Sequence, residues 1–119
     1  MNLKKIQEDI IQNKINHGFN ITDVPKEFCL LYGEVGEAYE AYRKKKSDLG
    51  GELADVAIYL LGISEILGFD LEKEIKEKME INKNRIYKKI NGVWVQQTDL
   101  TTVFNDTTNY VKGWRYGYI

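Results

Sequence analysis

Apolar residues recur every three or four positions up to about residue 89, a spacing that is typical of helices packed along one face. The first segment carries one apolar stripe, formed by Leu3, Ile6, Ile10 and Ile11. Gly18 is well suited to end this helix. Thr22 or Asp23 can cap the next helix, because Pro25 then falls in its first turn, where the missing N–H costs little.

The same pattern predicts three further helices. We expect the second over residues 25–45, and the third from a cap at residue 47 or 48 to about Leu67. Asp70 can cap a fourth helix, which we expect to extend to Lys89. Its packing stripe consists of Leu71, Ile75, Met79 and Ile86.

The pattern changes near the end of the fourth helix. Asn91 and Gly92 lie between two runs of strand-compatible residues, which predicts a β-hairpin. The rest is rich in Thr, Asn and aromatic residues and has no helical period, so short strands and an extended arm are both open. The expected fold class is all-α: a four-helix core over residues 1–90, and an extension over residues 91–119 that belongs to the same domain.

Length, charge and cysteine content narrow the class of protein. A chain of 119 residues is long enough for one domain. Its formal net charge of −1 gives no electrostatic reason to expect a nucleic-acid polymer or an anionic membrane as a partner. The single cysteine excludes an internal disulfide, and no apolar run reaches the roughly 20 residues of a membrane-spanning helix. We therefore expect a cytoplasmic protein.

The second helix is apolar on two sides, as a helix inside a bundle would be. One broad face contains Phe28, Leu31, Tyr32, Val35, Ala38, Tyr39 and Tyr42. Glu34 and Glu37 fall in the other row, together with Leu30 and Ala41. These two glutamates are therefore expected to face a neighbouring helix.

The third helix, apolar almost all round, begins with a matching pair of acids, Glu52 and Asp55. No Lys or Arg occurs at residues 27–42 or 47–72, so the four acids lack basic partners within their own helices. Two pairs on adjacent helices would converge and repel unless a cation lay between them, and oxygen ligands suit Mg²⁺ or Mn²⁺. Each acid alone is also consistent with a solvated charge. Glu34 and Glu37 could instead pair with lysines of the fourth helix, and the helix dipole favours Glu52 near a helix start.

Two cations and an amide on the fourth helix complement this acidic cluster. Lys78, Asn82 and Arg85 share one arc beside the packing stripe and would suit a polyphosphate bridged by metal ions. A helix rich in Lys and Glu also produces such an arc by chance. Residues 44–46, all lysines, are expected to form a solvated turn, although they would also attract a nucleotide.

Two segments, "EVGEAYEAYRK" and "ELADVAIYLLGISEILGFDLEKEIKEKMEINKNR", resemble the MazG-like branch of the all-α nucleoside triphosphate pyrophosphohydrolases. The family pattern is E-x-x-E followed by E-x-x-D, and the resemblance covers roughly residues 15–89. Many relatives carry a further acid where this chain has Gly33, and the segment from about residue 91 matches nothing in the family.

The resemblance implies Mg²⁺-dependent hydrolysis of a nucleoside triphosphate between the α and β phosphates, by a homodimer or homotetramer. It implies that Glu34, Glu37, Glu52 and Asp55 hold the metal, with Mn²⁺ as a possible substitute, and that Glu34 or Glu37 also activates the water. Lys78, Asn82 and Arg85 would bind the substrate. The alternatives are a non-catalytic nucleotide-binding or regulatory protein and a structural helical oligomer. Base and sugar preference stay open.

Overall fold

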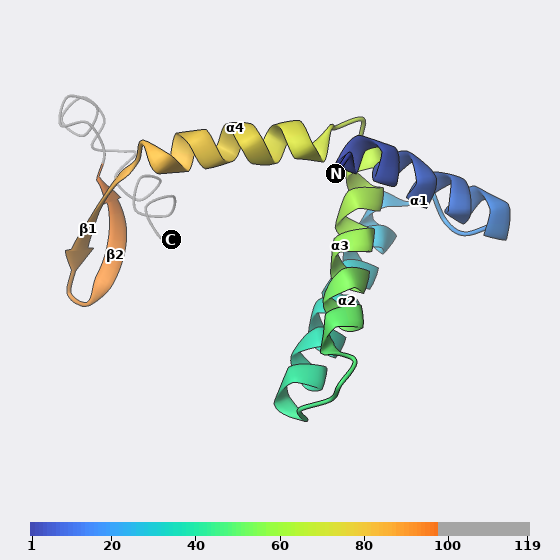
Figure 1. The fold of residues 1–119 in the computed structure, drawn as a ribbon, viewed down its shortest axis with the longest axis horizontal. Helices are drawn as coiled ribbons and strands as arrows, with labels where there is room; N and C mark the ends of the chain where they lie inside the picture. The colour runs from blue at the N-terminus through green and yellow to red at the C-terminus, as the bar shows by residue number, and fades with distance from the viewer. Residues whose placement is uncertain (98–119) are drawn as a thin grey trace. The chain divides into compact units, whose positions relative to one another are not determined.

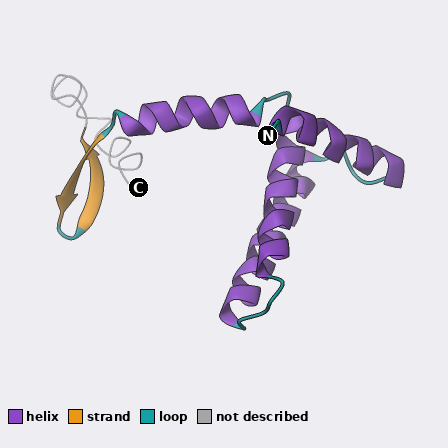
Figure 2. Ribbon diagram, viewed as in Figure 1, coloured by secondary structure: helices purple, strands orange, loops and turns teal. Residues whose placement is uncertain are grey.

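The computed structural model describes residues 1–97, which form four helices and one antiparallel hairpin (Figure 1). The predicted all-α core with a short hairpin is thereby confirmed (Figure 2). The expected aromatic arm lies outside the described residues. The elements, in chain order, are α1 (Leu3–His17), α2 (Val24–Arg43), α3 (Leu49–Ile66), α4 (Leu71–Lys83), β1 (Ile86–Ile90) and β2 (Val93–Gln97).

The chain divides into two compact units, Met1–Lys76 and Glu77–Ile119, which are described separately below. None of the described helices combines the length and apolarity that a membrane-spanning helix requires. The division of the chain into a core over residues 1–90 and an extension beyond it stays a prediction.

Short polar side chains start the helices largely where the sequence predicts. Asp23 caps α2 by accepting a hydrogen bond from the Lys26 amide at 3.1 Å, and Asp70 accepts one from the Lys73 amide at 3.3 Å. Gly18 ends α1 with φ of 68°, a left-handed conformation that glycine adopts without strain. Asp48 stands at the cap position of α3 but makes no capping hydrogen bond with its side chain.

The predicted end of the fourth helix is wrong. α4 ends at Lys83, and Ile86 belongs to β1 rather than to a helical packing stripe. The rest of the predicted stripe is not buried either, since Ile75 is 41% and Met79 64% exposed. The cause is the turn at Asn91 and Gly92, whose φ values of 51° and 79° are those of a tight hairpin. This turn pairs residues 86–90 with residues 93–97, so their backbone groups bond across the hairpin instead of along a helix.

In the first unit, α3 packs against both α1 and α2, and α2 and α3 run antiparallel (Figure 1). The helix α2 turns Leu31, Glu34, Ala38 and Ala41 toward this interface. Its broad aromatic face points away instead, with Tyr32, Tyr39 and Tyr42 between 63% and 72% exposed. The inner face therefore matches neither predicted side of α2. It combines Leu31 and Ala38, expected in the broad face, with Glu34 and Ala41 of the other row. Leu30, expected beside them, is 39% exposed.

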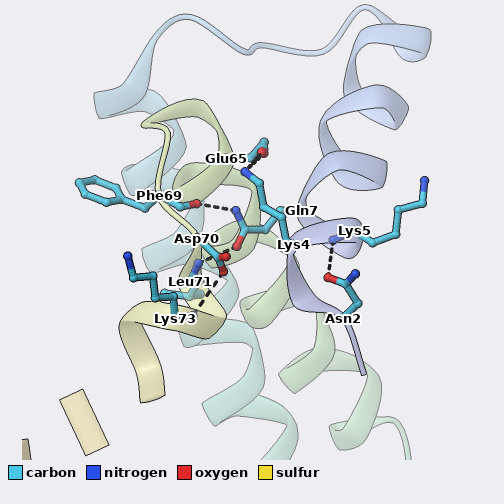
Figure 3. Close-up of polar contacts among 9 residues, drawn as sticks. All are labelled: Asn2, Lys4, Lys5, Gln7, Glu65, Phe69, Asp70, Leu71 and Lys73. Atoms are coloured by element: carbon cyan, nitrogen blue, oxygen red, sulfur yellow. Dashed lines mark hydrogen bonds and ion pairs between the residues drawn. The ribbon is translucent and has the colours of Figure 1, made fainter. Parts of the chain in front are cut away.

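A buried glutamine fastens α1 to the turn between α3 and α4 (Figure 3). The Gln7 side-chain nitrogen donates to the Phe69 carbonyl at 2.8 Å, and its oxygen accepts from the Leu71 amide at 2.9 Å. Beside it, Lys4 forms an ion pair with Glu65 at 2.6 Å. One side chain of α1 thus satisfies the Phe69 carbonyl and the Leu71 amide, two backbone groups at helix ends that α3 and α4 cannot satisfy by themselves.

We predict that Gln7→Ala lowers the free energy of unfolding by about 1–3 kcal/mol, because it leaves the Phe69 carbonyl and the Leu71 amide without their partner. Thermal denaturation measures this loss. The control is Gln12→Ala, which removes an exposed side chain bonded to Asn16 and should change stability by less than about 0.5 kcal/mol. Equal losses in the two variants would contradict the anchoring role.

Candidate metal centre

Three acidic side chains converge between α2 and α3. Glu34 and Glu37 come from the middle of α2, and Glu52 comes from the first turn of α3. Each offers one carboxylate oxygen that lies within 4.8 Å of those of the other two. The antiparallel pairing of the two helices produces this arrangement, because it sets the second half of α2 beside the start of α3. These residues are called the acidic cluster below.

The acidic cluster contains carboxylate oxygens that have lost water without gaining a partner. One oxygen of Glu34 and one of Glu52, the Oε2 atom in each case, are buried and accept no hydrogen bond. Within residues 1–97, no member of the cluster forms an ion pair, whereas Glu40 pairs with Arg43 and Glu65 with Lys4. Buried polar atoms are normally satisfied, so these two oxygens are exceptions that a bound cation would explain.

The pKa of Glu34 also shows that the carboxylates of the acidic cluster repel one another. Burial raises the pKa of the Glu34 carboxyl above its ordinary value. The negative charge of Glu37, a hydrogen bond with Glu37, and then the charges of Asp55 and Glu52 raise it further. The charged form of Glu34 is therefore disfavoured by both desolvation and repulsion. A divalent cation between the carboxylates would relieve the repulsion and supply the absent contacts.

Asp55, the fourth predicted ligand, lies at the margin of the acidic cluster. It is exposed and is not among the three residues whose oxygens converge. Its charge nevertheless acts on Glu34. The structure thus brings together three of the four predicted acids and leaves Asp55 beside them.

A second buried charge on α2 was missed by the sequence reasoning. Glu27 lies two turns before Glu34 on the same face and forms an ion pair with Lys14 of α1, and both side chains are buried. The Asn20 side chain donates a further hydrogen bond to Glu27 at 3.1 Å. Helical spacing identifies partners within one helix, whereas Lys14 reaches Glu27 from another helix.

Tyr59 lies between this ion pair and the acidic cluster. The Lys14 Nζ atom is 5.1 Å from the centre of the Tyr59 ring, a cation–π arrangement. Burial raises the pKa of the Tyr59 phenol, followed by the charges of Glu34 and Glu27. The phenol therefore stays protonated at neutral pH and can donate a hydrogen bond.

Lys78, Asn82 and Arg85 belong to the second unit. Lys78 and Asn82 are exposed on α4, but Arg85 follows the end of this helix, so the three do not share the single helical arc that was expected. The binding of substrate by these three residues stays a prediction.

The acidic cluster fits a hard divalent cation such as Mg²⁺ or Mn²⁺. Its donors are all carboxylate oxygens, two of them are buried without a partner, and three converge within the reach of one ion. Beside the cluster opens a pocket of about 430 Å³, which Glu37 and Glu52 line together with Lys44 and Lys46. The site therefore offers room for an anion next to the ligands.

Among known proteins, the chain is similar to one named dATP/dGTP diphosphohydrolase from Salmonella phage PMBT28. The two are 35% identical over 63 residues, which cover 47% of this chain and 22% of the phage protein. The chain thus spans only about a fifth of the length of this relative. No family model matches the chain, and no solved structure matches it.

We predict that Glu34→Gln stabilises the metal-free protein at neutral pH. A carboxyl whose pKa is raised by folding binds its proton more tightly in the folded state, so stability falls as the pH rises from the ordinary value of 4.5 through the raised one. Glutamine removes this loss. In EDTA, the melting temperature of the variant should exceed that of the wild type at pH 8 by a few degrees, and the difference should shrink at pH 4.5.

The outcome that would contradict this prediction is a variant less stable than the wild type at pH 8. Glu8→Gln serves as the control, because Glu8 is exposed on α1 and its replacement should leave the pH dependence unchanged.

Proposed function

We propose that this protein is a Mg²⁺-dependent nucleoside triphosphate pyrophosphohydrolase that cleaves between the α and β phosphates. The observation that carries the proposal is the convergence of Glu34, Glu37 and Glu52, with two buried carboxylate oxygens that lack a partner. The paired E-x-x-E and E-x-x-D pattern supports it, as does the name of the phage relative.

The chemistry requires a water molecule, a base and neutralised phosphates. Glu34, Glu37 and Glu52 would hold Mg²⁺, with Asp55 as a further ligand and Mn²⁺ as a substitute. The bound ion would offset phosphate charge and lower the pKa of a coordinated water. Glu34 or Glu37 would accept the proton of the water that attacks the α-phosphorus. The bond from this phosphorus to the bridging oxygen breaks, so the products are a nucleoside monophosphate and pyrophosphate.

The substrate follows from the relative only as a proposal. Its name specifies dATP and dGTP, so these purine deoxynucleotides are the first substrates to test. We also propose assembly into a homodimer or homotetramer, because the exposed aromatic face of α2 leaves Tyr32, Tyr39 and Tyr42 in water. Lys78, Asn82 and Arg85 are proposed as additional phosphate contacts.

The test is the release of pyrophosphate from dATP and dGTP in the presence of Mg²⁺. We expect turnover by the wild-type protein and a loss of roughly 100-fold or more in kcat for Glu37→Gln and Glu52→Gln, since each removes a ligand or the base. Glu8→Gln is the matched control and should retain full activity.

Two results would reject the catalytic proposal. If no nucleoside triphosphate in a panel of canonical and modified nucleotides is turned over, the protein is not a pyrophosphohydrolase. If nucleotides bind with Mg²⁺ but are not cleaved, the non-catalytic binding protein is the better description.

A further inference from the structure

Two pockets of the first unit lie along α3, one at the acidic cluster and one further toward the end of the helix. One, of about 360 Å³, lies between α1 and α3 and is lined by Asn13, Phe19, Ile58 and Tyr59 among others. The other is the pocket of about 430 Å³ that contains Lys44 and Lys46. We call them the aromatic pocket and the lysine pocket.

Both pockets are lined by residues from the same side of α3. Glu52 lines the lysine pocket and Tyr59 lines the aromatic pocket, with Asp55 between them. The three residues are spaced at i, i+3 and i+7, so they follow one side of the helix. At a rise of 1.5 Å per residue, Glu52 and Tyr59 are about 10 Å apart along the axis. The acidic cluster and the lysine pocket thus lie toward the start of α3, and the aromatic pocket lies further along the same side of this helix.

The aromatic pocket has the chemistry of a nucleobase site. Phe19 offers an aromatic ring on which a planar base can stack. Ile58 and Tyr59, whose ring Lys14 approaches from one face, add apolar surface. The amide of Asn13 can both donate to and accept from the edge of a purine. Lys14 also lines this pocket, but its charge is neutralised by Glu27. The pocket therefore favours an uncharged aromatic ring over a phosphate.

The lysine pocket has the opposite character. Lys44 and Lys46 form no ion pair within the described residues, although their charges lower the pKa of Glu40 after the larger effect of Arg43. Between them, Lys45 has φ of 54°, a conformation that costs a residue other than glycine about 1 kcal/mol or more. This strained turn carries two cations into the pocket that Glu37 and Glu52 also line.

We propose that the nucleotide lies along this side of the α2–α3 pair in one orientation. Its base occupies the aromatic pocket, its α-phosphate lies at the acidic cluster, and its β and γ phosphates point toward Lys44 and Lys46. The proposal rests on the proposed function and adds to it the residues that recognise the base and the leaving group. Departing pyrophosphate then gains negative charge next to the two lysines.

The positions of the base and of the phosphates can be tested separately with the two reaction products, dAMP and pyrophosphate. For the base end, the probe is dAMP, measured by isothermal titration calorimetry. Phe19→Ala and Asn13→Ala should weaken dAMP binding about tenfold and leave the binding of Mg²⁺–pyrophosphate unchanged. The control is Asn16→Ala, because Asn16 is exposed on α1 and bonded to Gln12.

For the phosphate end, the double variant Lys44→Ala, Lys46→Ala should weaken Mg²⁺–pyrophosphate binding about tenfold without affecting dAMP, and should raise the KM for dATP. The control is Lys45→Gly, which removes the same charge at the adjacent position and relieves its positive φ. This control should bind pyrophosphate as the wild type does and should melt at a higher temperature.

The outcomes separate the orientation from the activity. Suppose that the wild type cleaves dATP, but the lysine variant weakens the binding of dAMP or the Phe19 variant weakens the binding of pyrophosphate. The orientation is then wrong, and the proposed function stands. Unchanged binding in all variants also overturns the orientation. If the wild type neither cleaves dATP nor binds pyrophosphate with Mg²⁺, both the proposed function and the orientation fail.

Discussion

The repulsion among three carboxylates held between α2 and α3 is the constraint on which the rest of the structure depends. Glu34, Glu37 and Glu52 converge where α2 and α3 pack against each other, next to the small buried side chains of Ala38 and Ala41. Desolvation and mutual charge make this arrangement unfavourable in the absence of a counter-ion. A protein gains nothing in stability from such a cluster, so we attribute it to function.

The first unit contains a second buried acid on α2, and residues of the chain itself neutralise its charge. Glu27 is also buried on the inner face of α2, but Lys14 of α1 neutralises it and Asn20 completes its hydrogen bonds. The helix α1 is in turn held by Gln7 at the α3–α4 turn. The contrast between the satisfied Glu27 and the unpartnered oxygen of Glu34 two turns away supports the proposed cation site. The lysine pocket and the aromatic pocket both lie along α3.

Much of the fold could be predicted from sequence because local chemistry determines it. Asp23, Asp70 and Gly18 set helix ends through hydrogen bonds and backbone freedom that involve only nearby residues. The end of α4 was mispredicted because cross-strand pairing outweighed helical propensity at Ile86. The ion pair of Lys14 with Glu27 could not be found by local spacing, since it joins residues of two helices. The acidic pairs were recognised because their i, i+3 spacing and apolar surroundings are visible in the sequence itself.

Titration of the metal-free protein with Mn²⁺, followed by electron paramagnetic resonance, tests the central claim most directly. The account predicts saturable binding of Mn²⁺ that Mg²⁺ displaces, and a loss of about tenfold or more in affinity for Glu52→Gln. Glu8→Gln should bind as the wild type does. If Mn²⁺ does not bind, or binds equally well to Glu52→Gln, the acidic cluster is not a metal centre.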